Sequence, residues 1–125
     1  MIYLDTHVVV WLYAGLVEKL SQTASDMIEE NDLFISPIII LELSYMYESK
    51  KISRTPRVII SELQKKIGLK IGEHRYETIV DQTDGLSWTH DPFDRLIVAQ
   101  AMINRNPLIT KDKHILKNCP IAVWN

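Results

Sequence analysis

Two aspartates, Asp5 and Asp112, stand at the ends of short apolar runs. Asp5 directly follows Ile2–Leu4, and Asp112 follows the run 108–110 after a single lysine. If these runs are parallel strands, both carboxylates lie at carboxyl ends of strands, where open α/β sheets bind their ligands. The pair therefore indicates one edge of a sheet as a place for chemistry.

Two further acids, Glu42 and Asp94, lie within apolar segments that have helical spacing. Glu42 is flanked by apolar residues on both sides in the run 38–43. Asp94 precedes Ile97 and Val98 by three and four residues, which places it on the apolar stripe of a helix. A carboxylate on such a face must be paired, protonated or bound to a metal ion.

These four acids are scattered along the chain, yet one sheet edge could collect them all. Carboxylates crowded into one cleft repel each other unless a cation lies among them. Hard oxygen ligands suit Mg²⁺ or Mn²⁺, and such an ion binds phosphate oxygens and activates water. The chemistry predicted from this set is metal-assisted cleavage of a phosphodiester bond.

Each acid also has a purely structural explanation. Asp91 and Asp94 stand at the start of an expected helix, where carboxylates cap the helix and are favoured by its dipole. Asp112 could cap a short final helix, Asp5 could simply end a strand, and Glu42 could form a structural salt bridge. The metal-binding hypothesis therefore depends on the acids meeting, not on any one of them.

The helices and strands that must position these acids are predicted from apolar runs and from the capping and proline residues between them. Strands are predicted at 2–4, 33–35, 69–71, 108–110 and 121–123. A capping residue followed by proline occurs three times, at Ser36–Pro37, Thr55–Pro56 and Asp91–Pro92. Each pair is predicted to begin a helix, and these helices end near residues 50, 67 and 105. Further helices are predicted after Thr6 as N-cap to about 14, and over 21–30, 75–83 and 112–117. Strands alternating with helices indicate an α/β fold with a parallel sheet covered by helices.

Composition limits the classes of protein to which the chain can belong. A length of 125 residues fits a single domain, 1–125, and a net charge of −2 does not fit a strongly basic nucleic-acid binder. The longest apolar run, 8–17, is well short of the ~20 residues that span a bilayer, so no membrane association is expected. One cysteine, Cys119, and the absence of an export signal favour the cytoplasm.

Four segments in this order and spacing resemble the PIN-domain nucleases, and within them the VapC-type toxins of prokaryotic toxin–antitoxin pairs. The segments are Ile2–Thr6, the apolar helix around Glu42, His90–Ala101 and Ile109–Asp112. The resemblance covers nearly the whole chain. It implies a three-layer α/β/α sandwich with a central parallel sheet and one nuclease domain.

The resemblance also implies roles for individual residues. Asp5, Glu42 and Asp94 match the acids that hold Mg²⁺ or Mn²⁺, Asp112 matches the fourth, more variable acid, and Asp91 an additional one. Thr6 and Thr110 match hydroxyl positions that support the site. The implied activity is that of an endoribonuclease acting on tRNA or rRNA, with a small antitoxin protein as partner and a homodimer as the assembly.

Basic side chains near the acids are candidates for contacts with RNA. They are Arg95, Lys111 and Lys113, with a further basic run at Lys50, Lys51, Arg54, Arg57 and Lys65–Lys66. For Arg95 a salt bridge to a neighbouring acid is an equal alternative, and for the lysines the alternative is a solvated surface.

Aromatic residues on the expected helices are assigned to packing in the core or a dimer in preference to base stacking. They are Trp11, Tyr13, Tyr45 and Tyr47. Leu41, Tyr45 and Tyr47 could also form an exposed apolar patch on the Glu42 helix for an antitoxin segment.

Three other functions compete with this hypothesis. An aspartate-nucleophile phosphohydrolase needs a second Asp two residues after Asp5, where this chain has His7. A non-catalytic RNA- or protein-binding module would carry an acid set that binds no metal. A housekeeping RNA-processing nuclease would use the same site, and the sequence does not separate it from a toxin.

Overall fold

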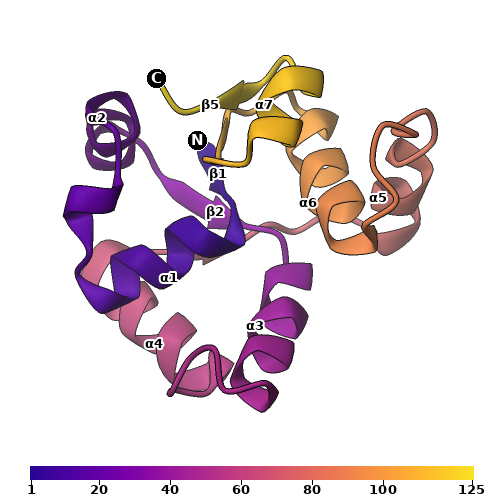
Figure 1. Ribbon diagram of the computed structural model, residues 1–125. Helices are drawn as coiled ribbons and strands as arrows, with labels where there is room; N and C mark the ends of the chain where they lie inside the picture. Colours follow the sequence, from indigo (N-terminus) through magenta and orange to yellow (C-terminus); the bar gives the residue numbers. More distant parts are fainter.

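The computed structural model describes residues 1–125, in which short strands alternate with helices (Figure 1). In chain order the elements are β1 (Ile2–Leu4), α1 (Thr6–Ala14), a 3-10 turn η1 (Val17–Lys19), α2 (Gln22–Glu30), β2 (Leu33–Ile35), α3 (Ile38–Glu48), α4 (Pro56–Ile67), β3 (Lys70–Ile71), α5 (Tyr76–Gln82), α6 (Pro92–Ile103), β4 (Leu108–Ile109), α7 (Lys113–Asn118) and β5 (Ala122–Val123). All five predicted strands are present, and η1 is the one element that the sequence patterns did not predict.

The strands form one fully parallel sheet with the order β3-β2-β1-β4-β5. Tyr3 in β1 is in register with Phe34 in β2 and with Leu108 in β4. In Figure 1, α1, α2 and α4 lie to the left of the sheet and α5, α6 and α7 to its right. The predicted three-layer α/β/α architecture is therefore confirmed.

The sheet order changes direction between β1 and β4, which are neighbours. The chain runs from β1 to β2 on one side of the sheet, whereas β4 and β5 are added on the other side. The connections that leave β1 and β4 therefore diverge and open a crevice at the carboxyl ends of these strands. Asp5 directly follows β1, and Thr110 directly follows β4.

The helix starts were predicted well where capping is local. Thr55 caps α4 by accepting a hydrogen bond from the backbone N–H of Val58, and Asp91 caps α6. The prediction for α1 was wrong, because its N-cap is Asp5, whose carboxylate accepts from the Thr6 N–H. Thr6 is the first helical residue, and its hydroxyl group donates a hydrogen bond to Glu42, which is distant in sequence.

Two other helix limits differ slightly from prediction. Helix α3 begins at Ile38, one residue after Pro37, and ends at Glu48 rather than near Lys50. Lys50 has a φ of 63° and Arg105, which follows α6, has a φ of 54°, so both residues leave the helical conformation and end these helices without a glycine. Helices α1 and α4 end at the predicted Gly15 and Gly68, which have φ of 72° and 66°.

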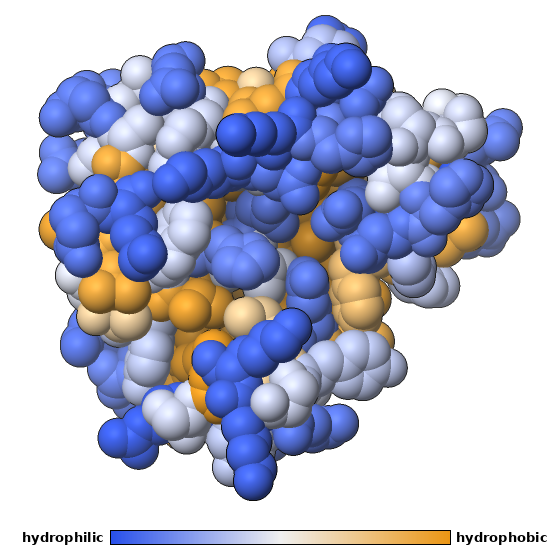
Figure 2. Space-filling view, in the orientation of Figure 1, coloured by the Kyte–Doolittle hydropathy of each residue, from blue (hydrophilic) through white to orange (hydrophobic).

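The hydrophobic core lies between the sheet and both helical layers and contains 25 buried residues. Helix α3 contacts α1, α4 and α6, so it connects the two helical layers near the crevice. Polar side chains cover most of the face shown in Figure 2, where apolar side chains reach the surface mainly over α1. None of the helices is long and apolar enough to cross a membrane.

Candidate active site

Asp5 is the centre of the crevice and is almost completely buried. One of its carboxylate oxygens, Oδ1, accepts from the Thr6 N–H at 2.8 Å, and the other, Oδ2, accepts from the Thr110 hydroxyl at 2.6 Å. Thr110 Oγ1 in turn accepts from the backbone N–H of Asp112 at 3.1 Å. Thr110 therefore joins the acids that follow β1 and β4 through one hydroxyl group.

Glu42 is brought to Asp5 by a contact between two helices. The hydroxyl group of Thr6, at the start of α1, donates to the Glu42 carboxylate on α3. The structure contains two ion pairs, Lys66–Glu62 and Arg75–Glu77, and neither involves an acid of the crevice. The structural salt bridge considered for Glu42 is therefore absent.

Asp91 and Asp112 act as helix caps, as their structural explanations required. Asp91 Oδ1 accepts from the N–H groups of Phe93 and Asp94 at 2.8 and 3.2 Å. Asp112 Oδ1 accepts from the next two N–H groups of α7 at 2.8 and 3.0 Å. In both residues the second oxygen, Oδ2, receives no hydrogen bond from the protein, so capping and ligand binding are compatible.

Asp94 has a strongly perturbed carboxyl group. Its pKa is raised to about 7, chiefly by burial and then by the charges of Asp91, Asp5, Asp112 and Glu42. These repulsions show that α3, α6 and the segments after β1 and β4 bring all five acids within electrostatic range of one another.

The other two buried acids show the same direction of shift. Burial raises the pKa of Asp5, and hydrogen bonds from Thr110 and Thr6 partly oppose the rise. Burial likewise raises the pKa of Glu42, against the hydrogen bond from Thr6, and the negative charges of Asp5 and Asp91 add to the rise. The charge of His7 lowers the pKa of Asp5 and Glu42 slightly, but no acid of the cluster forms an ion pair, and each ionised member makes ionisation of the others harder.

The donor set fits a hard divalent cation. It consists of carboxylate oxygens, several without a hydrogen-bond partner, and it has no counter-ion within the chain. No three acidic, histidine or cysteine side chains form a ready-made set of metal ligands, so a bound ion would have to draw the carboxylates closer.

A cleft of about 250 Å³ opens beside these acids. It is lined by Asp5 and Asp112 together with His7, Val8, Trp11 and Lys111. A larger pocket of about 670 Å³ lies against β2 and β3 and contains none of the acids, so size does not identify the site. Trp11 was expected to pack in the core or in a dimer; it does pack on the core, but it also lines this cleft.

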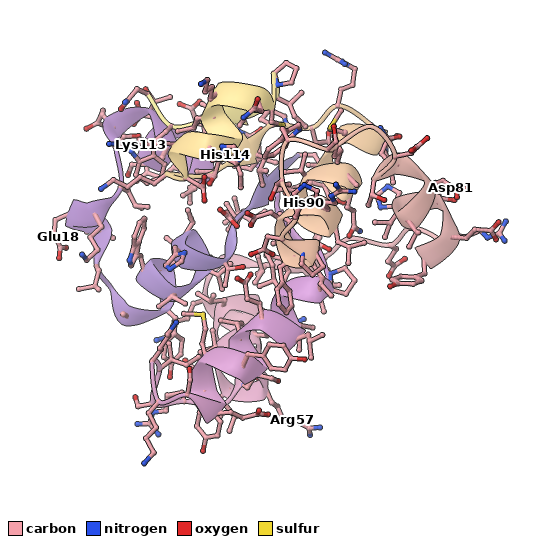
Figure 3. The ribbon with its side chains drawn as sticks, turned by 45° about the vertical axis from the view of Figure 1, so that its right-hand side comes forward. Glu18, Arg57, Asp81, His90, Lys113 and His114 are labelled. Carbon is pink, nitrogen blue, oxygen red and sulfur yellow. The ribbon has the colours of Figure 1, made fainter.

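The basic residues differ in their availability to a substrate. Arg95 does not pair with an acid; its Nε donates to the Thr89 carbonyl at 2.6 Å and so fixes the loop before α6. Lys111 and Lys113 flank Asp112 and are exposed. Figure 3 shows Lys113 and His114 on α7 and His90 before α6 on the same side of the molecule, whereas Asp81 projects from the far end of α5.

Residues 2–119 match the family described as the PIN domain. The chain belongs to the PIN-domain family. The match includes all five acids and both threonines of the crevice, so the resemblance inferred from the sequence is confirmed.

Individual PIN-domain relatives are similar over essentially their whole length. Ribonuclease VapC22 of Mycobacterium tuberculosis is 28% identical, with 98% of each chain covered. Among solved structures, VapBC2 from Rickettsia felis bound to a promoter DNA fragment has a TM-score of 0.71 at 20% identity and full coverage of both chains. A toxin–antitoxin complex from Klebsiella pneumoniae has a TM-score of 0.69 at 19% identity, covering 98% of this chain and 96% of that one.

Proposed function

We propose that this PIN-domain chain is a metal-dependent endoribonuclease and the toxin of a toxin–antitoxin pair. The observation that carries the proposal is a cluster of five carboxylates at the switch point of the sheet, none of which forms an ion pair with a basic side chain of the chain. Similarity to a ribonuclease and to toxin–antitoxin complexes supports the RNA substrate and the partner. We further propose that residues 1–125 form a single nuclease domain.

In this proposal Asp5, Glu42, Asp94 and Asp112 hold Mg²⁺ or Mn²⁺, and Asp91 is an additional acid of the site. The ion supplies positive charge against the phosphate and makes water a better nucleophile. No covalent intermediate is expected, because the acids have no activated Ser, Cys or Lys among them.

The hydroxyl groups of Thr6 and Thr110 have a positioning role in this mechanism. Thr110 fixes Oδ2 of Asp5, and Thr6 fixes one oxygen of Glu42, so two buried carboxylates keep a defined orientation before the ion binds. Hydrogen bonds of this kind to ligands usually matter for metal affinity almost as much as the ligands do. Lys111 and Lys113 are proposed to contact the RNA backbone at the rim, and the free guanidinium nitrogens of Arg95 are a further candidate.

The RNA is proposed to be a tRNA or an rRNA, and the site of action the cytoplasm, where both are found. Cleavage of total RNA followed by mapping of the new 5′ ends would identify the target. Ends distributed over messenger RNA alone would contradict this part of the proposal.

The first test combines metal binding with cleavage. Thermal unfolding is measured in EDTA, Mg²⁺ and Mn²⁺, and an ion at 100 times its Kd should add about 2.7 kcal/mol to the free energy of unfolding. Asp94→Asn should lose this stabilisation and the cleavage of RNA, whereas the matched variant Asp81→Asn on α5 should keep both. RNA cleavage by Asp94→Asn at the wild-type rate would refute the assignment.

An antitoxin segment is proposed to dock on the exposed apolar face of α3. Leu41 and Tyr45 are 43% and 53% exposed, and Tyr45 packs edge-on against Phe93 with ring centres 5.6 Å apart. Helical geometry places these two on one face, whereas Tyr47 lies ~120° or more around the helix. The predicted three-residue patch thus reduces to Leu41 and Tyr45.

This placement gives the antitoxin hypothesis a matched control. Tyr45→Ala should weaken binding of the cognate antitoxin, and Tyr47→Ala should change it much less. Equal affinities of both variants and the wild type would exclude this face. The proposed homodimer is tested separately, by size-exclusion chromatography at micromolar concentration, where a monomer would contradict it.

A further inference from the structure

Trp11 lines the same cleft as the acids Asp5 and Asp112. Trp11 comes from the middle of α1, and Trp124 packs against it in an edge-on arrangement with ring centres 6.1 Å apart. Because Trp124 is buried, it fixes the indole from behind. The rest of the Trp11 ring contributes to the cleft that also contains Asp5 and Asp112.

Two lysines from different segments place their ammonium groups on this indole. Lys19 Nζ, from η1, lies 5.8 Å from the ring centre, and Lys111 Nζ, from the loop after β4, lies 5.9 Å from it. The imidazole of His7 lies beside the same ring, at 6.1 Å between centres. Figure 3 marks the η1 segment by Glu18, the residue before Lys19.

Neither lysine forms an ion pair, although Lys111 is the direct neighbour of Asp112. Cation–π contact with the indole therefore holds two positive charges at the rim of a negatively charged cleft, where carboxylates would otherwise attract them. An aromatic face with positive charges around it is the combination with which proteins bind single-stranded nucleic acid.

We propose that Trp11, Lys19, Lys111 and His7 form a subsite for one unpaired nucleotide of the RNA, next to the metal-binding acids. The base stacks on the indole, and the lysine that it displaces from the ring pairs with a backbone phosphate. The proposal rests on the proposed nuclease function and adds a base-stacking position to it. The nucleotide at Trp11 must be unpaired, because a base within a duplex presents no free face to the indole.

Binding without metal tests the subsite independently of cleavage. The probes are a labelled ten-nucleotide oligoadenylate, an abasic ribose-phosphate chain of the same length, and an RNA duplex, each titrated in EDTA at low salt by fluorescence anisotropy. The wild type should bind oligoadenylate more tightly than the abasic chain or the duplex. Trp11→Leu should bind oligoadenylate about tenfold more weakly and leave the abasic chain within about twofold.

The lysines should behave differently from the ring. Lys111→Ala should weaken the oligoadenylate and the abasic chain equally, and it should reduce the slope of log affinity against log salt by about 0.7. Lys70→Ala, an exposed lysine on β3 whose ammonium group lies over the Phe34 ring, is the matched control for charge, and Tyr76→Leu, an exposed aromatic on α5, is the control for aromatic loss. Both controls should bind like the wild type.

Trp11→Leu could be unstable because Trp11 packs on Trp124, so Trp11→Phe provides a second measurement. Oligoadenylate should quench the tryptophan fluorescence of the wild type and not that of folded Trp11→Phe. Unchanged binding in Trp11→Leu together with unaltered quenching in Trp11→Phe would overturn the subsite, as would equal dependence of duplex binding on Trp11. Trp11-dependent binding without cleavage in Mg²⁺ or Mn²⁺ would instead refute the nuclease and leave the subsite in place.

Discussion

Two partly buried clusters of polar side chains lie next to β1 and have different electrostatic properties. The acid cluster, defined as Asp5, Glu42, Asp91, Asp94 and Asp112, carries charges of one sign. The amide–imidazole cluster, defined as Tyr3, His74, Gln100 and Asn104, is made of groups that can partner one another. Gln100 Nε2 lies 3.1 Å from His74 Nδ1, and Asn104 Nδ2 lies 3.2 Å from His74 Nε2.

The two clusters differ in how far side chains of the protein itself interact favourably with their polar groups. Gln100 is fully buried and links α6 to the loop after β3, so its polarity serves the fold. The carboxylates of the acid cluster repel each other, and none of them forms an ion pair with a basic side chain. The neutral groups of the amide–imidazole cluster serve the fold, although the Tyr3 hydroxyl and Gln100 Oε1 have no partner, whereas the repelling carboxylates of the acid cluster are the groups that we propose to bind a metal ion.

The largest effect is expected from pH, because three acids shift in the same direction. The pKa of Asp94 is about 7 in the folded protein and 3.8 in its ordinary state, so between these values the folded state binds more protons than the unfolded one. The free energy of unfolding in EDTA should therefore fall as pH rises from about 4 to about 7. The raised pKa values of Asp5 and Glu42 change the free energy of unfolding in the same direction.

Thermal unfolding in EDTA across this range measures the effect, with Asp94→Asn as the comparison. The variant lacks the titrating group, so its stability should depend less on pH and exceed that of the wild type at pH 7.5. A wild type that gains stability as pH rises would contradict the predicted repulsion. Saturating Mg²⁺ should reduce the dependence, because the ion favours the ionised acids.

Gly72→Ala should have the next largest effect, through the amide–imidazole cluster. A Cβ atom at this position would lie 2.4 Å from the Tyr3 hydroxyl oxygen and 2.6 Å from Gln100 Nε2. Both side chains are fully buried, so the overlap should cost about 1–3 kcal/mol of unfolding free energy. Urea unfolding measures the loss, and stabilisation by Mg²⁺ should be unchanged; a wild-type midpoint would show that the cluster is loosely packed.

Thr110→Val should have a smaller effect on stability and a specific one on the acids. The change removes the donor to Asp5 Oδ2 and the acceptor of the Asp112 N–H, which should cost about 1–2 kcal/mol. It should also raise the pKa of Asp5 further and weaken Mg²⁺ binding, because the carboxylate loses its orientation. A Mg²⁺ titration followed by unfolding separates the two effects, and unchanged Mg²⁺ affinity would exclude a positioning role.

Tyr3→Phe is the matched removal of a buried hydroxyl and should have the smallest effect. The Tyr3 hydroxyl has no hydrogen-bond partner, and burial raises its pKa, so it stays protonated. Its loss should alter the free energy of unfolding by less than about 0.5 kcal/mol. A loss as large as that of Thr110→Val would show that a buried water completes the amide–imidazole cluster.

Local sequence signals predicted most of the fold. Proline after a capping residue marked α4 and α6, and Gly15 and Gly68 marked helix ends, because these residues act through their own backbone geometry. The N-cap of α1 was assigned to Thr6 and is Asp5, since the Thr6 hydroxyl is used by Glu42, 36 residues away. Capping rules contain no information about such a distant partner.

The candidate acids were also identified from the sequence, but the hydrogen bonds that each carboxylate forms were not. Asp91 and Asp112 were treated as either caps or ligands, and the structure shows capping through one oxygen with the other left without a partner. The position of Trp11 in the cleft depends on Lys111 and Trp124, which come from the other end of the chain. Helical periodicity predicted only that Trp11 lies beside apolar residues of its own helix. It contains no information about contacts with residues that are distant in sequence.

The sequence by itself determined the elements and the acidic residues that could bind a metal ion, because backbone preferences and apolar periodicity act over a few residues. Tertiary structure alone decided which charges meet, which acids lack a counter-ion, and that a tryptophan with two lysines faces them. Those properties depend on distances between segments up to 105 residues apart, as between Asp5 and Thr110. Electrostatic interaction and burial follow spatial distance, and only the parallel sheet, with β1 beside β4, fixes that distance.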